Sequence, residues 1–85
     1  MPASREAIAV ALGEGSPWSD GVKSLIKWQF GIAGDFKQAL WRAIATADEG
    51  NLSRLERGFP GEVQAFRQWS QGNLASDLRK AGLEL

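Results

Sequence analysis

Cysteine, histidine and tyrosine are all missing from the 85-residue sequence. Without cysteine there is no disulfide scaffold and no thiolate nucleophile, and without histidine imidazole-based acid–base catalysis and the usual zinc-finger ligand sets are excluded. A surplus of charge is missing too, because ten Lys and Arg balance ten Asp and Glu. This neutrality argues against general affinity for nucleic acid, which needs Lys and Arg concentrated on one face.

Long apolar runs are also missing. The longest one, Ala7–Leu12, has six residues, whereas a membrane-spanning helix needs roughly 20. The run is also too short for the apolar centre of a secretion signal, and Arg5 and Glu6 precede it in place of a purely positive segment. We therefore expect no membrane association and a cytoplasmic protein.

What the sequence does contain is a globular composition, with 44% hydrophobic residues, and glycines that fall mostly between periodic segments. Its length suits one domain, which we place over residues 1–85. No segment alternates Val, Ile or Thr in the manner of a strand, so the sequence predicts an all-α fold, a single small domain of five to six short helices. The expected helices are 4–12, 22–33, 36–48, a short helix between Asn51 and Gly58, one from Pro60 to Gly72, and one from Asn73 to Ala81.

Helical periodicity predicts a core of eleven apolar residues. We expect the tail that begins at Gly82 to fray. The expected core residues are Val22, Leu25, Ile26, Phe30, Phe36, Leu40, Ile44, Leu55, Val63, Phe66 and Leu78.

Motifs that carry chemistry are not found. The acidic pair Asp48-Glu49 borders a turn, while Asp35 and Glu62 fall in first helical turns, where a carboxylate offsets the positive end of the helix dipole. No Asp-rich calcium loop, nucleophile elbow or phosphate-binding glycine loop is present. We therefore expect no catalytic, cofactor or metal site, and a protein that is not an enzyme.

Tryptophan is abundant, with four residues in the chain. Trp41 falls about 100° beyond Leu40 on its helix, on the side shared with Lys37, and Trp18 lies in an expected loop. Each of these two tryptophans either packs under a neighbouring helix or is an exposed anchor for a binding partner, because exposed Trp is enriched at interface hot spots.

Two arginines offer another candidate contact. Arg54 and Arg57 lie on the short fourth helix, where a small positive patch could touch phosphate or an acidic partner. Short helices joined by a glycine turn near Gly50 also fit the geometry of a helix-turn-helix. The candidate partner-binding residues are therefore Trp41, Lys37, Trp18, Arg54 and Arg57.

The segment 36–69 carries the pattern F-x-x-A-L, then A-D-x-x-N-L-x-x-L, then G-F-P-x-E-V. In this it resembles a group of small uncharacterised helical proteins encoded by phages and integrated mobile elements. The resemblance covers about 40% of the chain and implies no activity. It implies an inhibitor or adaptor, of which anti-CRISPR proteins are one class, and a partner that is a host or phage protein.

Two functions remain. The first is a non-enzymatic protein-interaction module that binds a larger protein or assembles as a homo-oligomer. The alternative is a small helix-turn-helix-like nucleic-acid-binding protein that uses Arg54 and Arg57.

Overall fold

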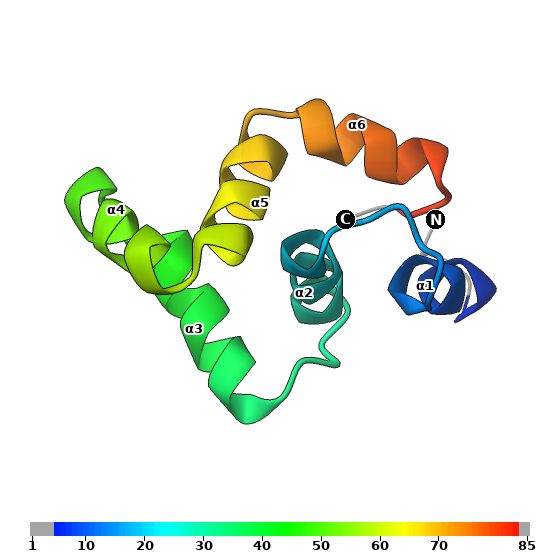
Figure 1. The fold of residues 1–85 in the computed structure, drawn as a ribbon, viewed down its shortest axis with the longest axis horizontal. Helices are drawn as coiled ribbons and strands as arrows, with labels where there is room; N and C mark the ends of the chain where they lie inside the picture. The colour runs from blue at the N-terminus through cyan, green and yellow to red at the C-terminus, as the bar shows by residue number, and fades with distance from the viewer. Residues whose placement is uncertain (1–4, 84–85) are drawn as a thin grey trace.

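The computed structural model describes residues 5–83, and in them the chain forms helices and loops but no strand. This confirms the all-α prediction; Ser4, the first residue of the expected helix 4–12, lies outside the described residues. The six helices (Figure 1) are α1 (Arg5–Leu12), α2 (Asp20–Gln29), α3 (Asp35–Thr46), α4 (Glu49–Gly58), α5 (Pro60–Ser70) and α6 (Asn73–Lys80).

The second helix is the centre of the fold. Figure 1 shows α2 surrounded by α3, α5, α6 and α1, with α4 projecting at the far side of α3 and α5. The two ends of the described chain lie near each other, beside α1 and the end of α6. The buried apolar residues come from all six helices and the tail: Ala11, Val22, Leu25, Ile26, Leu40, Trp41, Ile44, Leu52, Val63, Ala65, Leu74, Leu78 and Leu83.

Helix starts follow local hydrogen bonding. The Ser19 hydroxyl accepts a hydrogen bond from the backbone N–H of Val22 at 3.2 Å and caps α2. An Asp48 carboxylate oxygen accepts one from the Asn51 N–H at 2.8 Å, so Asp48 caps α4, which begins before the expected start at Asn51. Pro60 occupies the first turn of α5, as predicted, where its missing N–H costs nothing.

The predicted core is largely confirmed, with one clear error. Seven of the expected residues are buried, and Phe30, Leu55 and Phe66 are half-buried and pack against the core. Phe36 is 65% exposed and was wrongly placed in the core. The start of the tail also differs from expectation, because Leu83 is fully buried and its N–H donates to the Leu78 carbonyl at 2.9 Å. The last two residues of the tail lie outside the described part of the chain.

The error at Phe36 has a simple geometric cause. The stripe expected on α3 included Phe36 together with Leu40 and Ile44, but the buried arc runs through Leu40, Ile44 and Trp41. The covered face is thus rotated toward Trp41, since α3 packs against both α2 and α5. Phe36 falls outside this arc, and its ring lies beside that of Phe59, with centroids 6.0 Å apart.

Candidate functional site

Trp41 is not an exposed anchor. Its side chain is fully buried, and its ring stacks on Trp28 with centroids 5.1 Å apart and planes 6° from parallel. The indole N–H of Trp41 donates to the Ser24 hydroxyl at 2.9 Å, so its one polar group is satisfied. The structure therefore corrects the interpretation of Trp41 as a partner-binding residue and assigns it to the core.

Lys37 is engaged within the fold. Its ammonium forms an ion pair with the Glu62 carboxylate of α5, and it lies 5.9 Å from the centre of the Phe59 ring. The Glu62 side chain is only 13% exposed. Lys37 thus links α3 to α5, while its side chain stays 41% exposed.

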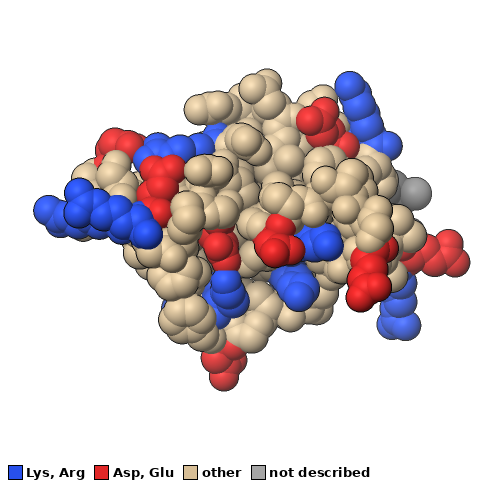
Figure 2. Space-filling view, in the orientation of Figure 1, with Lys and Arg blue, Asp and Glu red and all other residues tan. Residues whose placement is uncertain are grey.

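Arg54 and Arg57 are both exposed on α4. Arg54 donates to the Asn51 side-chain oxygen at 3.2 Å. The Lys and Arg side chains at the α4 end of the molecule lie beside Asp and Glu side chains (Figure 2). The surface around these arginines therefore has mixed charge.

Much of this mixed charge belongs to an ion-pair network between α4 and α5. Arg67 donates to the two carboxylate oxygens of Glu49 at 3.1 and 2.8 Å and to Glu56 at 3.4 Å. The hydrogen bond from Arg67 lowers the pKa of the Glu49 carboxyl, and the same bond raises the pKa of the Arg67 guanidinium. This network fixes α4 on α5 and leaves no excess of positive charge.

Trp18 differs from the other candidates because it lines an open hollow. The loop before it is held in place by three hydrogen bonds: the Trp18 N–H donates to the Ser16 hydroxyl at 3.2 Å, the Ser16 N–H to the Gly13 carbonyl at 3.3 Å, and Lys23 Nζ to the same carbonyl at 3.3 Å. These bonds hold the half-buried Trp18 ring beside α1.

The hollow next to Trp18, which we name the α1 groove, has a volume of about 480 Å³. Apolar side chains from α1, the loop and the end of α6 make most of its wall, and Val10 within it is 72% exposed. A second hollow of about 360 Å³ lies on the other side of Val10 and Pro17. The α1 groove is lined by Glu6, Ala7, Val10, Ala11, Pro17, Trp18 and Ala81.

Both hollows border the longest apolar run of the sequence, Ala7–Leu12, of which only Ala11 is buried. In the sequence this run excludes a membrane-spanning helix and a secretion signal, and it was not assigned to a binding surface. The run does contain a signal for an exposed apolar surface, because six consecutive apolar residues supply more apolar surface than one packed helix face covers. Of the five predicted partner-binding residues, only Trp18 lies at this groove.

Other kinds of site find no support in the described part of the chain. None of its helices is long and apolar enough to cross a membrane. Residues 5–83 contain no group of three or more acidic side chains arranged to hold a metal ion. Comparisons of the chain with protein-family models, with curated proteins and with solved structures find no match.

Proposed function

We propose that the chain is a non-enzymatic protein-interaction module that binds a larger protein through the α1 groove. The observation that carries the proposal is the exposure of Ala9 and Val10, within the most apolar segment of the chain, beside a hollow of about 480 Å³ lined by Val10. Small folded proteins bury such segments, and an exposed apolar surface rimmed by polar residues is typical of a protein-binding site. The half-buried Trp18 supplies the kind of rigid aromatic wall found at binding hot spots.

The groove favours one kind of partner element, a helix with an apolar face flanked by Lys or Arg. Glu6 lines one hollow and Glu14 lines the other, so carboxylates lie at both ends of the apolar strip around Val10. A partner helix that places apolar residues against Val10 and Trp18 would bring its flanking residues to these carboxylates.

The source and location of the protein rest on the sequence alone. The resemblance of the segment 36–69 to small helical proteins of phages and mobile elements supports an inhibitor or adaptor, in the manner of anti-CRISPR proteins, with a host or phage protein as its partner. The absence of cysteine and histidine supports a cytoplasmic, non-catalytic role. The resembling segment lies outside the α1 groove, so the two arguments are independent.

The helix-turn-helix alternative has weaker support. Arg54 and Arg57 are exposed at the projecting end of the molecule, but Glu49 and Glu56 lie on the same helix. Binding to phosphates would weaken steeply between roughly 50 and 200 mM salt, whereas binding through an apolar groove would not. Retention on DNA at low salt that is lost in an Arg54→Gln, Arg57→Gln double variant would support this alternative.

Selection of helical peptides from a displayed random library tests the groove. We expect the wild-type protein to enrich sequences with apolar residues at helical spacing and Lys or Arg at both ends. Val10→Glu should abolish this enrichment, because it places a charge at the centre of the apolar strip. Phe36→Glu is the matched control: Phe36 is similarly exposed but lies elsewhere, so enrichment should persist.

Two outcomes would contradict the proposal. One is a set of enriched peptides that bind wild type and Val10→Glu equally. The other is a wild-type protein that light scattering shows to be a dimer and a Val10→Glu variant that is a monomer, because the groove would then bind a second copy of the chain.

A further inference from the structure

One apolar face of α3 is left uncovered by the other helices. Phe36, Ala39 and Ala43 lie on one side of α3 because they are three, four or seven positions apart. All three are exposed, and Phe36 is 65% exposed. The neighbouring Leu40 is buried, so this face begins where the core ends. A helix of a small domain normally packs its apolar face, and an exposed phenyl ring on such a face is a candidate contact.

A hollow of about 470 Å³ continues this face toward the end of α3. It lies between α3 and α4, and half of its lining residues are apolar. We name it the α3–α4 hollow. Its lining residues are Ala43, Thr46, Ala47, Asn51, Arg54 and Leu55.

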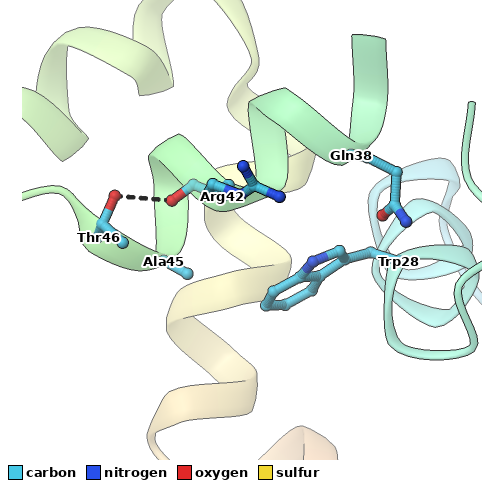
Figure 3. A pocket seen from close by; sticks show the side chains of 5 residues that line it. All are labelled: Trp28, Gln38, Arg42, Ala45 and Thr46. Atoms are coloured by element: carbon cyan, nitrogen blue, oxygen red, sulfur yellow. Dashed lines mark hydrogen bonds between the residues drawn. The ribbon is translucent and has the colours of Figure 1, made fainter. Parts of the chain in front are cut away.

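Two polar groups in the wall of the α3–α4 hollow are already hydrogen-bonded within the fold. The Thr46 hydroxyl donates to the Arg42 carbonyl of its own helix at 2.7 Å (Figure 3). The Asn51 side-chain oxygen accepts from Arg54 at 3.2 Å. An apolar group can therefore enter the hollow without leaving these two groups unpaired, which favours a hydrocarbon occupant over a polar one.

The projecting Phe36 and the α3–α4 hollow belong to the same patch. The middle of the α3 wall of the hollow follows Phe36 by roughly nine positions, or roughly 13 Å along the helix axis. A twofold axis midway between them would bring Phe36 of each copy of the chain to the hollow of the other. Ala39 and Ala43 flank this midpoint, and their small side chains allow two α3 helices to approach closely.

The two ends of this patch carry opposite charges. Asp35, next to Phe36, is exposed, and Arg54 lines the hollow. Neither forms an ion pair within residues 5–83, since both glutamates of α4 pair with Arg67 of α5. The twofold arrangement that places Phe36 in the hollow also brings Asp35 of each copy toward Arg54 of the other. The patch is thus complementary to itself in charge as well as in shape.

We propose that the chain forms a twofold-symmetric dimer in which the α3 helices pack antiparallel and Phe36 of each copy enters the α3–α4 hollow of the other. One second copy supplies both the apolar ring that the hollow accepts and the carboxylate that Arg54 lacks. Because the contact uses little more than one helix face per copy, we expect a weak dimer, with a Kd on the order of 10 to 100 µM. The inference does not depend on the α1 groove, whose residues take no part in this contact.

Sedimentation velocity over a range from about 5 µM to about 1 mM tests the proposal, because dimerisation follows mass action. We expect the wild type to change from monomer to dimer within this range. Phe36→Glu should weaken association at least about 100-fold, because it places a carboxylate in the apolar hollow. Val10→Glu is the matched control, since Val10 is equally apolar and 72% exposed but lies outside the patch. This variant should dimerise like the wild type.

Exchange of the two charges tests the pairing of Asp35 with Arg54. Asp35→Arg and Arg54→Asp should each weaken the dimer about three- to tenfold, since like charges then meet at both ends. An equal mixture of the two variants should associate as well as the wild type, because Arg and Asp again face each other at both ends. Spectra of ¹⁵N-labelled Asp35→Arg protein with unlabelled Arg54→Asp protein measure this recovery. Both positions are exposed, and melting temperatures show that the variants fold.

Three results would each overturn the proposal. They are a wild type that stays monomeric at the highest concentration, a dimer that persists in Phe36→Glu, and charge-exchanged variants that associate no better mixed than alone. A dimer that is lost in Val10→Glu and kept in Phe36→Glu would place the contact at the α1 groove instead, which separates failure of this inference from failure of the proposed function.

Discussion

The backbones of Gly21 in α2 and Gly61 in α5 meet so closely that a Cβ atom at Gly21 would lie 2.1 Å from the Gly61 carbonyl oxygen. Backbone atoms cannot move aside as a side chain does, so the helices must separate if Gly21 is enlarged. We predict that Gly21→Ala lowers the free energy of unfolding by about 1 to 3 kcal/mol or more. For a domain of this size each kcal/mol lowers the melting temperature by about 4 to 8 °C.

The partner glycine is the matched control. A Cβ at Gly61 would lie 3.7 Å from the Gly21 Cα, which is an ordinary contact. Gly61→Ala should therefore keep wild-type stability or gain up to about 1 kcal/mol from the reduced freedom of the unfolded chain. Equal melting temperatures for the two variants would contradict this description of the α2–α5 contact.

The rotated face of α3 gives a second prediction. Leu40 is 7% exposed and Phe36 is 65% exposed. Leu40→Ala should cost about 2 to 5 kcal/mol because it opens a cavity in the core, whereas Phe36→Ala should change stability by no more than about 0.5 kcal/mol. Urea denaturation of both variants measures the difference, and a larger loss at Phe36 would mean that α3 buries the opposite face.

These corrections show which features of the fold can be predicted from the sequence. Helix number and approximate boundaries were predictable because glycines, Pro60 and the capping residues act locally. The position of the buried arc on α3 was not, since it depends on where α2 and α5 lie, and the same pattern fits a stripe centred on either side of Leu40. For this reason Phe36, which was expected in the core, is exposed, and Trp41, for which both positions were open, is buried.

The candidate sites were predictable only in part. The position of Trp18 in a loop beside an apolar helix follows from its sequence neighbours. The pairing of Lys37 with Glu62 joins positions that only the fold brings together. The side-chain oxygen of Gln38 is buried without a hydrogen-bond partner in the described residues, at a hollow that Trp28 from another helix also lines. Sequence analysis could not have distinguished Gln38 from any other polar residue of a helix.

The pairing of Arg67 with Glu49 gives a prediction on pH. The hydrogen bond from Arg67 holds the pKa of the Glu49 carboxyl below its usual value. The resulting stabilisation is complete above the ordinary Glu pKa of about 4.3 and is lost as the pH falls through the lower pKa of the folded state. Carboxyl NMR should show this lowered pKa in the wild type and a return toward the ordinary value in Arg67→Gln.

The control for this titration is Arg57→Gln. It removes an exposed arginine of α4, the helix that carries Glu49, and should leave the Glu49 titration unchanged. Because both partners are solvent-accessible, high salt should also move the Glu49 pKa toward its ordinary value. A Glu49 carboxyl that titrates identically in wild type and Arg67→Gln would show that the two residues are not paired in solution.

The hydrogen bond between Trp41 and Ser24 gives the last prediction. Ser24→Ala leaves the buried indole N–H of Trp41 without an acceptor and should cost about 1 to 3 kcal/mol. Trp41→Ala, which removes the whole ring, should cost about 3 to 5 kcal/mol. In Trp41→Phe the N–H is gone, so adding Ser24→Ala to that variant should cost clearly less than it does in the wild type. A double-mutant cycle from thermal melts measures this coupling, and equal costs of Ser24→Ala in both backgrounds would mean that the hydroxyl does not stabilise the indole.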